Sequence, residues 1–473
     1  MKDVIIIGAG IAGLTAGLEL EEAGIDFQIL ESSNRAGGML ESVRKDNYLV
    51  ETGPHLFSSV SAEIMELVKK LDLKEELIEA NKDSKKRYIC LNSNLISLPR
   101  NPVDLYKSGL LSKDAKWTLL EEFVIPKEIK EETIEQFFLR RFGREVLKNI
   151  IQPFLIGVYA GDVVKLSANA VFPELKELEK KYGSILGGFI LSGKFKKLSS
   201  KCTFYSFKDG METLGKRAGE KLKNNITFNT SDLQVTRAKD FFIVSYKVNN
   251  KQMNYTANSV LFAVPAYKIM DYSHLFPNKH FMELFETEYM PMVVVSQSID
   301  KSKIGVNLDG FGFLCAHEPR RKLLGTLWES SIFLDRAPAE KALLTSFVGG
   351  AYHKKVLDQS EDEIISLISK ELAEILQISD KNAFETVHVK TYPKAIPQYY
   401  VGHLEKVKRV EEMMDKNYGL FFTGNYIRGI SVNDTIKTTK SVVKKIKRFL
   451  STVRNDGTAN DLEENPDKEL IKN

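Results

Sequence analysis

The stretch DVIIIGAGIAG, residues 3–13, decides the fold of the first part of the chain. Residues 3–7 are almost continuously apolar and read as a buried strand, and the glycine-rich GAGIAG follows at once. Apolar residues recur from Leu14 to Leu20 and predict a helix, and DFQIL (26–30) predicts a second strand. The order strand, turn, helix, strand is a βαβ unit, which predicts an α/β fold.

The glycines of this turn, Gly8, Gly10 and Gly13, have GxGxxG spacing. In that motif the first glycine makes a tight turn, the second lets a pyrophosphate approach the backbone, and the third allows helix and strand to pack closely. The N-terminus of the helix offers free N–H groups and partial positive charge to phosphates. The context predicts a Rossmann-like dinucleotide-binding domain. A glycine turn without a ligand is the alternative.

The residues after the second strand indicate which dinucleotide. Glu31, 18 residues after Gly13, is placed to accept hydrogen bonds from a ribose. ESSNRAGG (31–38) extends the motif, with Arg35 and a glycine pair continuing past the ribose as for a longer ligand. VETGPH (50–55) predicts a strand that runs into a glycine-proline turn. This arrangement resembles the flavin amine-oxidase superfamily and implies FAD, whereas Arg35 alone is also compatible with an ordinary surface arginine.

Composition bounds the class of protein. The 473 residues are 43% hydrophobic and 27% charged with a net charge of +4, which predicts two or three soluble domains and argues against nucleic acid as the main partner. Weak attraction to an anionic membrane surface remains compatible. The cysteines Cys90, Cys202 and Cys315 form no CxxC pair, which suits a reducing compartment, and the histidines lack metal-binding spacing.

The sequence predicts a cytoplasmic protein. Its first residues lack a basic leader, and no apolar run reaches the roughly 18 residues that a spanning helix needs. Peripheral contact with the inner face of the cytoplasmic membrane stays open. NIIQPFLIGVYAGD (149–162) and GSILGGFILSG (183–193) are the most apolar stretches. We interpret them as buried core helices, with a pocket or membrane-facing surface as the alternative.

A second glycine-bearing loop, GNYIRGISVND (424–434), precedes an amphipathic basic helix over 431–450. Ser431 or Asn433 is expected to cap the helix start. The helix dipole then points positive charge at the preceding loop. If FAD lies there, this charge meets the ring near N1 and O2, where negative charge collects on reduction. We therefore expect the first glycine turn to hold the adenosine end and this loop to hold the reactive end.

Three motifs resemble the oxygen-dependent protoporphyrinogen and coproporphyrinogen oxidases, over nearly the whole chain to about residue 450. They are GVYAGDVVKLSANAVFPELKELEKKYGSILGG (157–188), YPKAIPQYYVGH (392–403) and GNYIRGISVND. The resemblance implies a noncovalent FAD and a three-part build. The three expected parts are a discontinuous FAD-binding domain (1–84, 203–268 and 391–451), a mixed-sheet substrate-binding domain (85–98 and 269–390) and a helical insert (99–202). A disordered tail (452–473) is expected to follow them.

The resemblance also implies site residues. The expected FAD contacts are Gly8, Gly10, Ile11, Ala12, Gly13, Glu31, Ser32, Arg35, Gly38, Met39, Glu51, Thr52, Gly53, Pro54, Val235, Tyr392, Gly424, Ile430, Ser431 and Val432. The expected substrate contacts are Gly161, Phe311, Gly312 and Leu314. Two departures stand out. Asp209 in KDGM (208–211) replaces a glycine, and the carboxylate-binding arginine has no secure match, with Arg100 in LPRNP the nearest candidate.

The implied reaction is oxidation of protoporphyrinogen IX to protoporphyrin IX in three two-electron steps, with O2 as acceptor and H2O2 as product, in haem biosynthesis. Coproporphyrinogen III is the alternative substrate. A porphyrinogen that loses hydride leaves a stabilised cation, so we expect no catalytic acid or base. The histidine spacing gives no reason to expect a metal. Another flavin oxidase, acting on an amine or a carotenoid precursor, and a non-catalytic prenyl-binding escort protein are further alternatives. A homodimer is compatible with the sequence.

Overall fold

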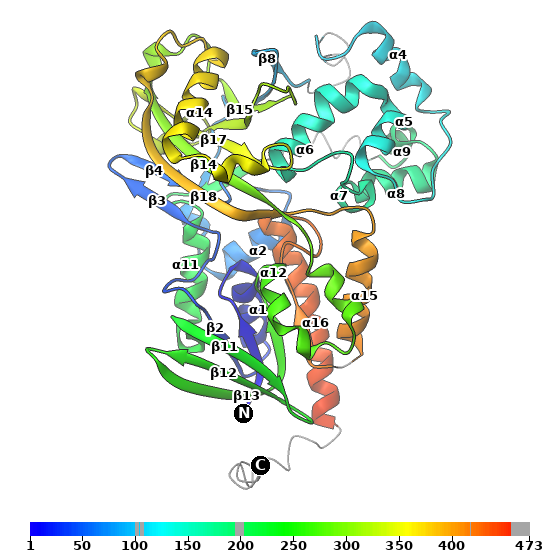
Figure 1. The fold of residues 1–473 in the computed structure, drawn as a ribbon, viewed down its shortest axis with the longest axis vertical. Helices are drawn as coiled ribbons and strands as arrows, with labels where there is room; N and C mark the ends of the chain where they lie inside the picture. The colour runs from blue at the N-terminus through cyan, green and yellow to red at the C-terminus, as the bar shows by residue number, and fades with distance from the viewer. Residues whose placement is uncertain (100–103, 105–107, 194–202, 417, 456–473) are drawn as a thin grey trace.

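A computed structural model describes residues 1–99, 104, 108–193, 203–416 and 418–455 (Figure 1). Two seven-stranded sheets organise these residues. The sheet that begins with the N-terminal strand lies in the lower part of Figure 1, and the second sheet and a helical unit lie above it. Arg100 falls outside the described residues.

The first sheet contains the predicted βαβ unit. Its strand order is β10 (Ile226–Thr227), β2 (Phe27–Leu30), β1 (Lys2–Ile7), β13 (Lys251–Phe262), β12 (Phe242–Val248) and β11 (Thr230–Arg237), with β19 (Leu420–Phe422) also paired to β13. β1 runs parallel to β2 and β13, whereas β11, β12 and β13 form an antiparallel meander. Val4–Ile7 are buried, as expected for a parallel strand covered on both faces.

Helices pack around this sheet. α1 (Ile11–Glu21) contacts α11 (Glu212–Lys221) and α16 (Val432–Asn455), and α16 also contacts α2 (Ala62–Lys70). The predicted start of the disordered tail at residue 452 is wrong, because α16 continues to Asn455. Val453 extends the apolar stripe of the helix and packs against the core that buries Leu450.

The second sheet is mixed. Its order is β18 (Glu385–Pro397), β14 (Tyr289–Asp300), β17 (Lys341–Gly349), β16 (Leu323–Trp328), β15 (Gly310–Cys315), β7 (Lys86–Leu91) and β8 (Asn94–Ser97). β7 and β8 form an antiparallel hairpin. The predicted domain boundary between residues 390 and 391 falls inside β18, so residues 391–397 lie in the second sheet. α14 (Glu361–Ile375) packs against this sheet's core.

The helical unit follows β8 in the chain. Its helices are α4 (Lys113–Glu121), α5 (Ile134–Val146), a π-helical turn (Leu147–Ile151), α6 (Gln152–Tyr159), α7 (Ala168–Val171), α8 (Pro173–Tyr182) and α9 (Ile185–Leu191). Thr133 and Gln136 form a capping box at the start of α5. Arg141 is fully buried and pairs with Glu122 and Glu179, so this unit carries a buried ionic core as well as an apolar one.

The two apolar stretches of this unit differ in burial. α6 buries one face, with Phe154 and Val158 about two fifths exposed on the other, whereas Ile190 and Leu191 at the end of α9 are 62% and 73% exposed. The interpretation of both as core helices is therefore wrong for the end of α9. Among the described helices, none combines the length and apolar character that crossing a membrane would require.

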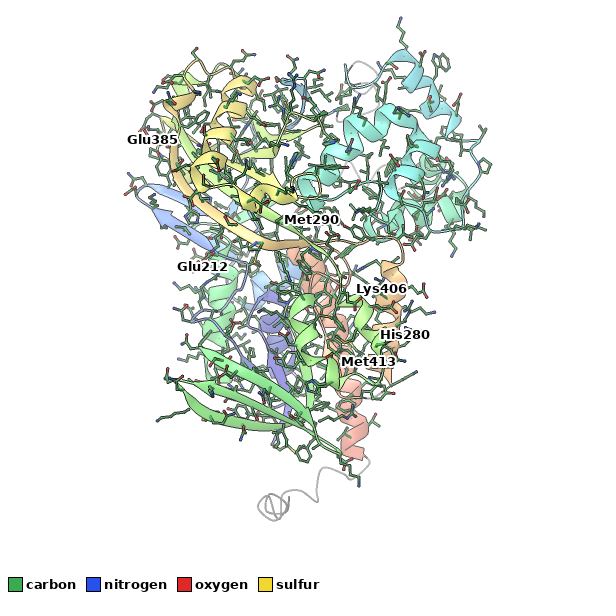
Figure 2. All side chains as sticks on the ribbon, viewed as in Figure 1. Glu212, His280, Met290, Glu385, Lys406 and Met413 are labelled. Atoms are coloured by element: carbon green, nitrogen blue, oxygen red, sulfur yellow. The ribbon has the colours of Figure 1, made fainter. Side chains whose placement is uncertain are left out.

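Shorter elements complete the fold. The remaining α-helices of the described residues are α12 (Ala266–Ile269), α13 (Glu329–Ile332) and α15 (His403–Asp415). One small sheet pairs β3 (Ser42–Lys45) with β4 (Tyr48–Glu51). In the other, β9 (Phe204–Phe207) lies between β5 (Phe57–Ser58) and β6 (Leu77–Glu79). Figure 2 labels Met290 of β14 between the upper and lower parts of the molecule, where it is fully buried. It belongs to a cluster that joins Ile156 and Ala160 of the helical unit to Leu324 of the second sheet.

Candidate cofactor and substrate site

A cavity of about 790 Å³ lies between the two glycine-bearing loops. Gly8, Gly10 and Glu31 line it on one side, and Gly424 and Ile430 line it on the other. Other residues expected to contact FAD that also line it are Ile11, Ala12, Ser32, Gly38, Met39, Pro54 and Val432. Its size is in the range of small-molecule and cofactor sites.

The first turn divides its glycines by role. Gly8 has a positive φ of +102°, and a Cβ there would lie 2.8 Å from the carbonyl oxygen of Ala263. A Cβ on Gly13 would lie 1.9 Å from the carbonyl oxygen of Gly8. Around a Cβ on Gly10, by contrast, no described atom lies within 4 Å. Gly8 and Gly13 therefore hold the turn against the sheet, and Gly10 leaves space on the cavity side.

Helix α1 begins at this open position. Its N-cap is Gly10, which supplies no side-chain hydrogen bond, and its first turn contains no acidic residue. The first N–H groups of a helix have no partner within the helix, and they carry partial positive charge. This helix start can therefore accept an anionic pyrophosphate.

Glu31 lies at the cavity edge directly after β2. Its carboxylate accepts hydrogen bonds from the backbone N–H of Ala9 at 2.7 Å and of Ser33 at 2.8 Å. These bonds fix the carboxylate beside the glycine turn. A carboxylate has further lone pairs, which can accept hydrogen bonds from ribose hydroxyls.

Arg35 acts on the loop and does not line the cavity. Its guanidinium donates to the carbonyl oxygens of Leu40 at 3.0 Å and Gly38 at 2.7 Å. Gly38 and Met39 of the same loop line the cavity. The structure therefore places Arg35 as a clamp on the loop that faces the ligand.

The Glu51–Pro54 turn also splits between cavity and frame. Pro54 lines the cavity, but Glu51, Thr52 and Gly53 do not. Glu51 is buried and accepts hydrogen bonds from the Ser42 hydroxyl and the Met211 N–H.

The other two residues of that turn contact neighbouring loops. The hydroxyl of Tyr392 donates to Thr52, which links this turn to β18. A Cβ on Gly53 would lie 2.0 Å from the Met39 carbonyl oxygen, so glycine permits close contact between the two loops.

A buried charged cluster next to this turn was not predicted. His55 Nδ1 lies 2.7 Å from Glu329 Oε1, and Arg336 lies 3.8 Å from Glu51. Burial raises the pKa of Glu51 to about 7, although Ser42, Arg336 and the Met211 N–H lower it. Burial opposes the charge of His55, but Glu329 raises its pKa above the ordinary value. The position of His55 directly after the glycine-proline turn was the sequence signal.

The C-terminal loop is held by its own helix and by α15. Ser431 accepts a hydrogen bond from the Asp434 N–H at 3.1 Å and so caps α16, whereas Asn433 accepts from the Ile64 N–H. Of the two caps predicted, Ser431 is the one used. The neighbours of Ser431 on both sides line the cavity, and Ser431 itself does not.

The motif that precedes this loop braces it. The Tyr399 hydroxyl donates to the Asn425 carbonyl oxygen, and His403 Nε2 contacts the Ile427 carbonyl oxygen at 3.0 Å. Burial lowers the pKa of His403 to about 4, so this imidazole is neutral near pH 7. These two residues belong to the motif YPKAIPQYYVGH (392–403), for which the sequence predicted no role for Tyr399 or His403.

Val235 does not line the cavity. It is buried in β11, and its carbonyl oxygen contacts His274 Nε2 at 2.8 Å. Asp232 and Leu233, three and two residues earlier, line the cavity instead. A backbone contact from this strand to a ligand is therefore better placed at those residues.

The expected substrate residues lie outside this cavity. The Phe311 ring packs against Phe204 and under the guanidinium of Arg87, 4.2 Å from its centroid. Gly312 has a φ of +127°, and a Cβ there would lie 2.0 Å from the Thr326 carbonyl oxygen.

The other two substrate candidates contact the helical unit. Leu314 touches Gly157 on α6, where a Cβ would lie 2.2 Å from Leu314 Cδ2. A Cβ on Gly161 would lie 2.4 Å from Leu166, so Gly161 is a packing glycine. These residues hold the second sheet against the helical unit.

Asp209 is accommodated on the surface. Its carboxylate lies 2.5 Å from Arg44 and is well exposed. The neighbouring Gly210 has a φ of +87° and keeps the close approach to Ser42. The departure at Asp209 therefore does not disturb the turn.

Several known proteins are similar to this chain over most of its length. The family model described as flavin containing amine oxidoreductase matches residues 11–446. Protoporphyrinogen oxidase 2 of Arabidopsis thaliana is 29% identical over 97% of this chain and 96% of its own length. Coproporphyrinogen III oxidase of Bacillus subtilis (strain 168) is 27% identical over 95% of this chain and 98% of its own length.

Solved structures share the fold. A crystal structure from Exiguobacterium sp. 255-15, which carries a provisional protoporphyrinogen oxidase assignment, has a TM-score of 0.79 at 22% identity over 94% of this chain and 99% of that one. Cyclohexylamine oxidase from Brevibacterium oxydans IH-35A has a TM-score of 0.69 at 13% identity over 95% and 99%. The α/β architecture with a Rossmann-like sheet and a mixed sheet is therefore confirmed.

Proposed function

The chain belongs to the flavin containing amine oxidoreductase family, and we propose that it is an FAD-dependent oxidase that converts protoporphyrinogen IX to protoporphyrin IX. The reaction removes six electrons and six protons in three two-electron steps, and three O2 accept them as three H2O2. It oxidises CH–CH groups with oxygen as acceptor, in tetrapyrrole biosynthesis. Full-length similarity to porphyrinogen oxidases carries the proposal.

The residues fit a noncovalent FAD. The open position at Gly10 and the uncapped start of α1 suit the pyrophosphate, and the anchored Glu31 suits the ribose. No cysteine stands in 424–434, where covalent monoamine oxidases resemble this loop but carry one. When bound, FAD supplies a two-electron acceptor that dioxygen can restore.

The chain's own residues orient the bound cofactor and shield the site from bulk water. Ser431 fixes the start of α16, whose dipole directs positive charge at the loop holding Gly424 and Ile430. Tyr399 and His403 prevent this loop from moving away. Because the neutral His403 is buried, it holds the loop without adding a charge. We assign no acid or base, since an electron-rich macrocycle can lose hydride without deprotonation first.

Coproporphyrinogen III is the second candidate substrate. Relatives named for either reaction match at similar identity and coverage, the B. subtilis and Staphylococcus aureus enzymes being coproporphyrinogen III oxidases. The substrates differ in their number of propionates. We propose Arg100 as the carboxylate-binding residue, on the resemblance of its segment alone.

The test is porphyrin fluorescence against time, in air, with each porphyrinogen in parallel and a no-protein control. We expect faster fluorescence with protoporphyrinogen than the control and equimolar peroxide per two electrons. A preference for coproporphyrinogen would replace the substrate. Protein that binds FAD but gives no fluorescence above the control with either substrate would overturn the porphyrinogen assignment.

We also propose peripheral membrane contact through α4 and α9. Trp117 and Leu120 are 68% and 58% exposed, and Leu191 on α9 is 73% exposed. The C-terminal end of α4 meets the start of α9, because Glu122 after α4 accepts hydrogen bonds from the Ser184 hydroxyl and the N–H of Ile185. An exposed apolar face with an interfacial tryptophan suits a bilayer surface.

Sedimentation with anionic vesicles tests this contact. The double variant W117S/L120S should lower the vesicle-bound fraction several-fold, because it removes exposed apolar side chains and leaves the core intact. A matched control is M253S, which changes an exposed apolar residue on β13. Equal sedimentation of all three proteins would contradict membrane contact by this face.

A further inference from the structure

Two buried thiols lie together in the second sheet. Cys90 is the fifth residue of β7 and Cys315 the last residue of β15, and they are direct partners in the parallel pairing of these strands. Both cysteines are free, and they are only 1% and 2% exposed.

The neighbouring groups shift the pKa values of the two thiols in opposite directions. The neighbouring Cys315 thiol, Arg321 and the backbone N–H of Ser93, in the turn between β7 and β8, lower the pKa of the Cys90 thiol, whereas burial and Glu318 act against this shift. Burial and the neighbouring Cys90 raise the pKa of Cys315 well above its ordinary value.

Arg321 is a buried cation beside this pair. It is 8% exposed, and its Nε has no hydrogen-bond partner among the described residues. Its other nitrogens donate to Ser93 Oγ at 2.7 Å and lie 3.6 Å from Glu371 and Glu374. Glu318 lies 4.0 Å away. An anionic sulfur at Cys90 would be attracted by this guanidinium, and a neutral one less so.

We propose that Cys90 and Cys315 form a peroxide-reactive dithiol, in which Cys90 attacks and Cys315 resolves. The Cys90 thiolate attacks one oxygen of H2O2, the O–O bond breaks, and with one proton the products are Cys90 sulfenic acid and water. The Cys315 sulfur then attacks the Cys90 sulfur, forms the S–S bond and releases a second water. Two thiols and one H2O2 thus give one disulfide and two waters.

The strand geometry allows this bond. Paired strands lie about 4.8 Å apart, which is within the Cα separation that a disulfide bridges. Small-molecule thiols can reduce such a disulfide by thiol–disulfide exchange and so restore the dithiol. The bond would tie β7 to β15 beside Leu314, where the second sheet meets α6. The peroxide source rests on the proposed oxidase reaction, whereas the chemistry of the pair does not.

The first experiment uses the full chain with Cys202→Ser as background and reagent H2O2 under native conditions. We expect a mass loss of two hydrogens, a peptide linking Cys90 to Cys315, and full recovery with a thiol reductant. If both cysteines remain free to alkylation after unfolding, under conditions that oxidise a small thiol in the same tube, the proposal is overturned.

The second experiment assigns the order of attack. In Cys315→Ser, a sulfenic-acid reagent should label Cys90. In Cys90→Ser, Cys315 should stay unlabelled. Labelling of Cys315 at the rate found for Cys90 would overturn the assignment of Cys90 as attacking group. Arg321→Gln should slow the labelling of Cys90 and Arg321→Lys should retain it, because only the lysine keeps the charge. Equal rates in both would remove Arg321 from the mechanism.

Turnover separates this inference from the proposed function. With porphyrinogen, air and FAD-loaded protein, the disulfide should form and added catalase should prevent it. A disulfide that forms with reagent peroxide but not with porphyrinogen would speak against peroxide production by this protein and would leave the dithiol assignment standing.

Discussion

Gly10 and Gly312 stand in similar short stretches, GAG and GFG, but the structure uses them in opposite ways. A Cβ on Gly10 would meet no described atom within 4 Å, whereas a Cβ on Gly312 would lie 2.0 Å from a backbone carbonyl oxygen. The first glycine leaves space for a ligand, and the second allows two strands to approach. A Gly-x-Gly stretch alone therefore does not distinguish a binding position from a packing position.

The largest expected effect is on the open glycine. Gly10→Glu places a long anionic side chain where the pyrophosphate is expected, so the purified protein should lose its visible flavin absorbance entirely. The fold has room for the side chain, and circular dichroism should show the native secondary structure. A yellow G10E protein with a full complement of flavin would refute the cofactor assignment of this turn.

The packing glycine should show the opposite pattern. Gly312→Ala forces a Cβ into the Thr326 carbonyl and leaves an alanine at a φ of +127°. We expect a loss of roughly 2–5 kcal/mol in the free energy of unfolding. Urea unfolding of G312A against wild type, both with flavin bound, measures it. Gly24→Ala is a useful control, because Gly24 also has a positive φ but no described atom within 4 Å of a Cβ. Equal losses in both variants would assign the effect to φ alone.

The first turn was predictable because its physics is local. The contact that requires Gly13 is made by the Gly8 carbonyl oxygen of the same turn, and Gly8 itself has a positive φ of +102°, so the glycine spacing in the sequence reports this turn. The substrate side has no such signal. Phe311 meets Arg87 and Phe204, which come from distant parts of the chain. Only the packing of β9 against β7 and β15 of the second sheet brings them together.

Single residues inside a correct motif were also hard to assign. The motif identified the turn 51–54, but only Pro54 of it lines the cavity, while Glu51 faces the buried charges of His55, Glu329 and Arg336. Glu329 and Arg336 come from the second sheet's connections, so no local pattern predicts them. A motif predicts that a segment lies at a site, and burial decides which of its side chains face the ligand.

The Glu51 cluster gives a pH test of that distinction. The folded-state pKa of Glu51 is raised from 4.5 to about 7, and that of His55 is also raised. The folded protein therefore binds more protons than the unfolded chain above pH 4.5, and stability falls as pH rises through about 7. From Glu51 alone we expect a loss of about 3 kcal/mol in the free energy of unfolding between pH 4.5 and 8.

The variant Glu51→Gln isolates this contribution. Its amide oxygen can accept from the Met211 N–H and its amide nitrogen can donate to Ser42, so the buried hydrogen bonds are kept without a titrating group. The decline of stability with pH should become shallower by the Glu51 share. An unchanged slope in E51Q would show that Glu51 is ionised in the folded protein throughout this range.

The smallest expected effect distinguishes the residue that caps α16 from the residues that line the other end of the cavity. Ile430 and Val432 line the cavity, and Ser431 between them caps α16. Ser431→Ala should cost about 1 kcal/mol in the free energy of unfolding, because the Asp434 N–H loses its partner. Flavin content should stay unchanged, since the side chain does not face the cavity. Asn433→Ala is the matched control and should cost less, because the bond that Asn433 accepts from the Ile64 N–H is longer, at 3.4 Å against 3.1 Å. If S431A instead lost flavin at unchanged stability, Ser431 would be a ligand contact, and the division between residues that face the cavity and residues that hold its frame would fail in this loop.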